Sequence, residues 1–174
     1  MRPSAPREWT SVPVLTMLSV AVLALAAGIV LFVDPFHSSA APNPNRAVVD
    51  HQDTFEVIGQ VDTALQHVLS YNYADPGATQ TAAKQVLVGD AAHQFQVLYD
   101  ALQQKASGQQ LTLSAKVVQS GVYSLTGDKA ELLVFLDQTS VRKSDGTTAT
   151  SPAQIQVSAV KQGNVWRINE LHPH

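Results

Sequence analysis

The chain has 174 residues, a formal net charge of −3 at pH 7 and no cysteine. A slightly acidic chain without a run of Lys and Arg lacks the basic surface that nucleic-acid binding requires, so we expect no nucleic-acid partner. The absence of cysteine excludes disulfides, thiol catalysis and cysteine-ligated metals.

Residues 12–33 form an apolar stretch without a charged side chain, and Arg2 and Arg7 precede it. A helix of this length reaches about 33 Å, which is enough to cross a hydrocarbon core of about 30 Å. The positive charges before the stretch predict that the N-terminus lies in the cytoplasm. We therefore expect a single-pass protein of the cytoplasmic membrane, with a cytoplasmic N-terminus at 1–11, a transmembrane helix in the bilayer at 12–33 and an extracytoplasmic remainder.

A cleaved signal peptide is the rival interpretation of the same stretch. Small residues at Ser39, Ala40 and Ala41 resemble a cleavage site, and Pro42 would follow the cut. The apolar part of a signal peptide is usually about 7–15 residues long, so the greater length here favours an uncleaved anchor. Residues 34–49 contain three prolines and several small polar residues, which predict an extended linker between the anchor and a domain at 50–174.

Three helices are predicted in the first half of this domain. Apolar residues recur at spacings of three and four from Phe55 to Leu69, which indicates an amphipathic helix that ends near Tyr73. The sequence Asp75-Pro76-Gly77 breaks that helix. A second, short helix is expected from about Thr79 to Leu87, and a third from Asp90 to Ser107.

The apolar pattern then changes to a period of two, which is typical of strands. Four or so strands are predicted between Leu111 and Pro173, with turns near residues 126–129, 144–147 and 162–164 and a bend or bulge at Gly121. Helices followed by consecutive strands indicate an α+β domain. We expect a cone of about three helices packed on a bent antiparallel sheet.

The segment from Ala130 to Leu136 is apolar on both faces of its predicted strand. Leu133 and Phe135 lie on the face opposite Leu132 and Val134. Either this second face packs under the helices, or it is a surface for a partner. Trp166, in the last strand, is expected to fill the core.

In their order along the chain, several segments resemble the Mce-associated membrane proteins of actinobacteria, which combine an N-terminal anchor with a cone domain of the SnoaL-like and nuclear-transport-factor-like type. The likeness covers the anchor and roughly residues 58–173. The segments that carry it are Leu69-Ser70-Tyr71-Asn72-Tyr73, Leu87-Val88-Gly89, Gly121-Val122, Val134-Phe135-Leu136-Asp137-Gln138-Thr139, Gly163-Asn164-Val165-Trp166-Arg167-Ile168 and Leu171-His172-Pro173.

The resemblance implies an accessory subunit of an Mce-type lipid or sterol transport complex in the cell envelope, with other transporter subunits as partners. The family is not defined by catalytic residues, so the expectation is a non-enzyme without cofactor or metal. The inner-membrane scaffold of type IV secretion machines has the same fold and remains an alternative. A weak isomerase with Asp137 as its base is a further one.

Six apolar and aromatic residues are expected on the apolar sheet face or near the cone mouth, where they would contact another subunit or, alternatively, line a pocket for an apolar lipid. These candidate residues are Tyr71, Tyr73, Phe95, Tyr99, Leu133 and Phe135.

Overall fold

The computed structural model describes residues 45, 47 and 51–174. The predicted cytoplasmic segment, the anchor at 12–33 and nearly all of the linker lie outside these residues. Within the described part of the chain, every helix is too short or too polar to cross a membrane.

The domain contains three α-helices, a short 3₁₀ helix and five strands. The helices are α2 (His51–Val68), α3 (Pro76–Val86) and α4 (Gly89–Ala106), and η1 (Ser107–Gln109) follows them. The strands are β1 (Tyr71–Asn72), β2 (Leu111–Thr126), β3 (Lys129–Arg142), β4 (Thr147–Gln162) and β5 (Val165–Pro173). They form one antiparallel sheet in the order β1-β2-β3-β4-β5. The predicted α+β architecture is therefore confirmed, with one more strand than the four expected.

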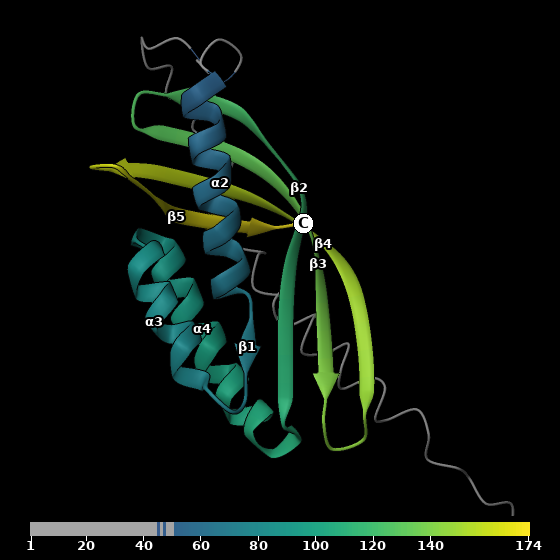
Figure 1. Ribbon diagram of the computed structural model, residues 1–174. Coiled ribbons are helices and arrows are strands. Elements are labelled where there is room, and N and C mark those ends of the chain that lie inside the picture. The colour runs from purple at the N-terminus through teal and green to yellow at the C-terminus, as the bar shows by residue number, and fades with distance from the viewer. Residues whose placement is uncertain (1–44, 46, 48–50) are drawn as a thin grey trace, which may run out of the picture. The chain divides into compact units, whose positions relative to one another are not determined.

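The helices lie on one side of the bent sheet, which we call its inner face (Figure 1). α2 crosses in front of the strands, and α3 and α4 lie beside each other. The core between them is formed by α2 side chains such as Val61 and Leu65, and by Leu132, Val157 and Ile168 of the sheet, all fully buried. Trp166 is only 2% exposed, so its predicted place in the core is confirmed.

The predicted helix boundaries differ from the structure around Tyr71. α2 ends at Val68 and not near Tyr73, because Tyr71 and Asn72 leave the helical path and pair with Leu113 and Thr112 of β2. α3 begins at Pro76, earlier than the predicted Thr79. The Asp75 side chain accepts a hydrogen bond from the Ala78 amide, and Pro76 needs no amide partner in the first turn.

The predicted interruption at Gly121 is displaced in the structure. Gly121 pairs regularly with Leu133, and the register of β2 shifts on either side of it, at Val118 and at Tyr123. Each bulge inserts one residue and increases the local bend of the strand. Two bulges therefore produce the curvature that the sequence pattern assigned to one glycine.

Phe55 is expected from the sequence in the apolar stripe of the first helix, and this prediction is wrong. Its side chain is 71% exposed, whereas Val57, Val61 and Leu65 are completely buried. At about 100° per residue, Phe55 lies roughly 140° around the helix from the centre of the buried stripe. The stripe begins only at Val57.

Candidate interaction surface

The two faces of β3 have opposite environments, although both are apolar. Leu132, Val134 and Leu136 point into the core and are at most 2% exposed. Leu133 and Phe135 alternate with them on the face that carries no helix, which we call the outer face. Leu133 is partly exposed, and Phe135 is 41% exposed. Within the described residues, nothing covers this face as the helices cover the inner one.

Tyr123 adds an aromatic ring to the outer face. It lies at the second bulge of β2 and is 46% exposed. Its hydroxyl accepts a hydrogen bond from the Gln156 side chain of β4. Since β3 lies between β2 and β4, the ring reaches over β3, where Gln156 is the register partner of Leu133. Tyr123, Leu133 and Phe135 together form what we call the outer patch.

The register partners of Leu133 and Phe135 in the flanking strands are small or uncharged. Gly121 lies opposite Leu133 in β2, and a Cβ atom there would meet nothing within 4 Å, so the flank of Leu133 is open. Gln119 and Gln154 lie on either side of Phe135. The strands on either side of Leu133 and Phe135 therefore present no charged side chain directly beside them.

A polar row borders the outer patch. Ser158 donates a hydrogen bond of 2.8 Å to Glu131, and His172 lies 3.2 Å from Glu170. Burial raises the pKa of the Glu131 carboxyl, and the nearby Glu170 raises it further, while the hydrogen bond from Ser158 opposes the change. Burial, and then the charge of Glu131, also raise the pKa of the Tyr123 hydroxyl. A half-buried carboxylate thus lies directly beside an exposed apolar surface.

The four predicted aromatic residues of the helical region lie together, but they are packed. Phe95 stacks on Tyr99 at a centroid distance of 5.3 Å, and Tyr71 meets Tyr99 edge-on at 6.3 Å. Tyr71 and Tyr99 are at most 4% exposed, and the Tyr99 hydroxyl donates to the Pro76 carbonyl. Tyr73 packs against this cluster, and its hydroxyl accepts a hydrogen bond from Lys143.

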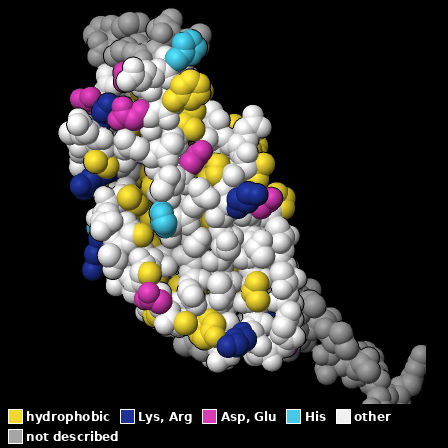
Figure 2. Space-filling model, viewed as in Figure 1, with side chains coloured by type: hydrophobic (Ala, Val, Ile, Leu, Met, Phe, Trp, Pro, Cys, Tyr) yellow, Lys and Arg dark blue, Asp and Glu magenta, His cyan; other side chains and the backbone are white. Residues whose placement is uncertain are grey.

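The six candidate residues therefore fall into two separate places. Tyr71, Tyr73, Phe95 and Tyr99 form a small core between α4 and the start of β2, together with Leu111. Leu133 and Phe135 lie on the outer face of the sheet. Figure 2 views the helical side, where apolar side chains form small groups among polar ones. On the described residues, the outer patch is the better candidate surface.

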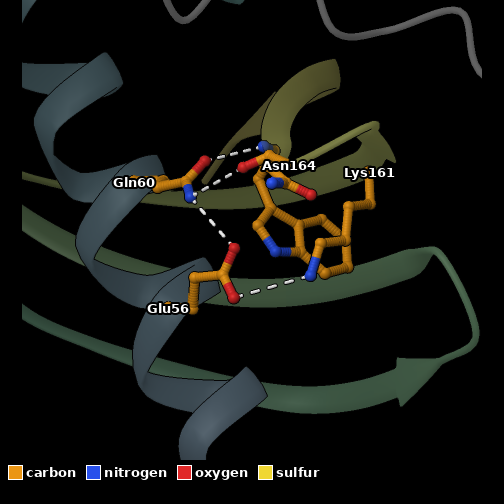
Figure 3. Close-up of polar contacts among 5 residues, drawn as sticks. Glu56, Gln60, Lys161 and Asn164 are labelled. Carbon is orange, nitrogen blue, oxygen red and sulfur yellow. Dashed lines mark hydrogen bonds and ion pairs between the residues drawn. The ribbon is translucent and has the colours of Figure 1, made fainter.

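A group of polar contacts made by Glu56 and Gln60, which we call the polar lock, holds α2 on the inner face (Figure 3). The sequence did not predict it. Gln60 accepts a 2.7 Å hydrogen bond from the Trp166 amide and donates to the Asn164 carbonyl at 3.3 Å. Gln60 also donates to Glu56, which forms a 3.5 Å ion pair with Lys161. The contacts of Gln60 with residues 164 and 166, and of Glu56 with Lys161, join residues more than 100 positions apart, so no local pattern could reveal them.

The carboxylate that faces inward is not the one proposed as a base. Asp137 lies on the outer side of β3, opposite Lys116 and Pro152. Asp62 of α2 instead reaches β2, where it accepts a 2.8 Å hydrogen bond from Ser120. Burial raises the pKa of Asp62, and the bond from Ser120 opposes that effect.

No protein-family model matches the chain, and no curated protein matches it. Solved structures are similar in fold. An IcmL-like type IV secretion system protein of Legionella pneumophila has a TM-score of 0.59 at 8% identity, over 72% of this chain and 93% of that one. CagV, a VirB8 homologue of the type IV secretion system of Helicobacter pylori, has a TM-score of 0.58 at 7% identity, over 68% and 96%.

A third protein with a similar structure is not described as a component of a secretion system. Aln2 from a Streptomyces species has a TM-score of 0.52 at 10% identity, over 72% of this chain and 91% of that one. At such low identities, these likenesses establish a shared fold and no common function. None of the three is described as an Mce-associated protein, so the family expected from the sequence belongs with the proposals.

Proposed function

We propose that this chain is a non-catalytic accessory subunit of an Mce-type lipid transport complex, anchored in the cytoplasmic membrane by residues 12–33. Its extracytoplasmic domain acts through contacts with other subunits of the complex. One observation carries the proposal: the outer patch is apolar and uncovered in the described structure, while every helix packs on the opposite face. Exposed apolar surfaces with a polar rim are typical of protein interfaces.

A lipid pocket inside the cone has less support. The space under α2 is filled by large side chains, and Leu65, Leu132 and Ile168 are completely buried there. A lipid chain would have to displace these packed residues, at a cost that apolar contacts with the ligand would need to offset. Binding of an apolar ligand therefore ranks below contact with another protein.

Catalysis also has less support than assembly. A base on this fold would act from the apolar interior, but Asp137 lies on the outer face and Asp62 is engaged by Ser120. We therefore propose a role without chemistry.

A scaffold subunit of a type IV secretion machine is the second candidate. The fold neighbours from Legionella pneumophila and Helicobacter pylori favour it, because both are described as type IV secretion proteins. The ordered sequence segments favour the Mce-type complex. Both candidates share the anchored domain and the outer patch, and they differ in the partner.

Crosslinking of the full-length protein in its native membrane, followed by mass spectrometry, separates the candidates. Recovery of Mce-type solute-binding subunits or their permease supports the first. Recovery of secretion components such as a coupling ATPase supports the second and contradicts the first. If neither class of subunit is captured, the assembly role itself is wrong.

A further inference from the structure

One half of β4 has an unpaired edge. β4 pairs with β3 from Thr147, opposite Arg142, to Val160, opposite Lys129. Its pairing with β5 begins only at Ile155, which lies opposite Pro173. Residues 147–153 thus have a neighbouring strand on one side only, among the residues that the structure describes. Their backbone groups on the other side are available to another strand.

The register identifies which backbone groups point outward. The Gln154 carbonyl accepts a 3.0 Å hydrogen bond from His174, so Gln154 directs its backbone toward the β5 side. In an antiparallel strand, every second residue directs its N–H and C=O to the same side. Thr148 and Thr150 therefore offer both groups at the free edge, whereas Pro152 offers only its carbonyl. All three residues are exposed.

The free part of β2 and the outer edge of β5 are protected in ways that this edge is not. The free part of β2 has its two bulges, and Asn45 binds its backbone at Leu125 and Tyr123. β5 carries a bulge at Asn169, and its Ile168 carbonyl accepts a hydrogen bond from Val88. Bulges and covering segments are common means of preventing edge-to-edge pairing.

The free half of β4 lacks these protections. Its register with β3 has no bulge, and the chain has no charged side chain from Gly146 to Val160. Charged residues, especially lysine, are the usual guard of an exposed edge. Pro152 is its one protective residue, and it blocks only the end of the segment nearest β5. A flat, uncharged edge that begins at Thr147 favours pairing with another strand.

We propose that this edge pairs with the same edge of a second copy of the chain, antiparallel and centred on Ala149. A two-fold axis at Ala149 places Thr148 opposite Thr150 of the second copy, and Thr150 opposite its Thr148. Each of these two pairs exchanges two hydrogen bonds, so the ladder contains four. Pro152 falls opposite the turn residue Gly146 of the second copy, where its missing N–H is not needed. The edge is thus complementary to itself in hydrogen bonding, size and charge.

Cysteine substitutions in the full-length protein, studied in its membrane, test whether a second copy of the chain is the partner. The chain has no cysteine of its own, so the introduced thiol is the only one in the protein. Across the proposed axis, Ala149 meets Ala149 of the second copy in a pair without hydrogen bonds, at a Cα distance of about 4.5 Å. That distance lies within the range that a disulfide spans. We expect Ala149→Cys to yield a disulfide-linked dimer on mild oxidation.

Ala153→Cys is the matched control. It lies on the same strand and face, and it is also partly buried. Its counterpart in the second copy would be about 26 Å away, at about 3.3 Å per residue, so no disulfide should form. We expect at least tenfold more linked dimer from Ala149→Cys than from Ala153→Cys.

Thr150→Pro tests the ladder itself. It removes an N–H that β3 does not use, as Pro152 already does two residues later, so circular dichroism should remain unchanged. Combined with Ala149→Cys, it should lower the yield of linked dimer at least tenfold. Equal yields from the two cysteine variants, an unchanged yield with Thr150→Pro, or linkage only to a different protein would overturn the proposal. None of these results depends on which transport complex the chain serves.

Discussion

The inner and outer faces of β3 both carry apolar side chains, but helices cover only the inner face. Leu132 and Val134 are completely buried beneath α2, while their neighbours Leu133 and Phe135 lie on a face without helices. The same strand therefore supplies both the core of the domain and its candidate interface. Alternation along the sequence defines two faces of a strand, but the packing of distant elements determines which face is covered.

Truncation of neighbouring leucines should produce the largest difference between the two faces of β3. Leu132→Ala should lower the free energy of unfolding by about 2–5 kcal/mol, because it leaves a cavity in a packed core. Leu133→Ala should cost less than about 1 kcal/mol, because its side chain is partly hydrated already. Thermal and urea unfolding of the two full-length variants measure the difference. Equal losses would mean that the outer face is also covered.

The polar lock of Gln60 gives a smaller effect on the inner side. Gln60→Ala removes the acceptor of the Trp166 amide and should cost about 1–3 kcal/mol of unfolding free energy. Gln66→Ala is the control, because the hydrogen bond that the Gln66 side chain donates to the Asp62 carbonyl lies within α2, and its loss should cost less than about 0.5 kcal/mol. If the two substitutions have the same effect by urea unfolding, the lock does not fasten α2 to the sheet.

The pH dependence of stability should report on the carboxyl group at the edge of the outer patch. The pKa of Glu131 is raised in the folded state, so its ionisation destabilises the protein as the pH rises from the unfolded pKa through the folded one. Glu131→Gln should remove this decline in melting temperature. The hydrogen bond from the Thr147 amide lowers the pKa of the Asp145 carboxyl. The ionised carboxylate therefore stabilises the folded state, and this stability is lost as the pH falls through the folded pKa. Asp145→Asn should remove this pH dependence. Both contributions to the change of melting temperature with pH should be small. If Glu131 and Asp145 changed the stability in the same direction as the pH rises, the assigned pKa directions would be wrong.

Local patterns were enough to predict much of the fold. The alternation around Leu132 and Val134, the turn at Gly127 and the turn at Gly163 all correspond to strands and hairpins in the structure. Both glycines have a positive φ, which explains why these positions ended the strands. Short-range chemistry determines such features, so a single sequence contains them.

The features that the sequence did not predict depend on distant partners. Tyr71 leaves the helix because β2, 40 residues later, offers it a strand to pair with. The bulge at Tyr123 lies where Asn45, 78 positions earlier, binds the backbone. The choice between the two faces of β3 likewise depends on α2. The sequence identified the six candidate residues by their apolar and aromatic character, but their division into a packed cluster and an outer patch required the structure.

Site-specific photocrosslinking tests whether the outer patch contacts a partner. A photoreactive phenylalanine analogue is placed at Phe135 or at Phe55 of the full-length protein in its native membrane. Both positions are exposed phenylalanines, but Phe55 lies on α2, away from the patch. We expect position 135 to capture a transport-complex subunit and position 55 not to capture one. Capture from position 55 alone, or equally from both positions, would contradict it.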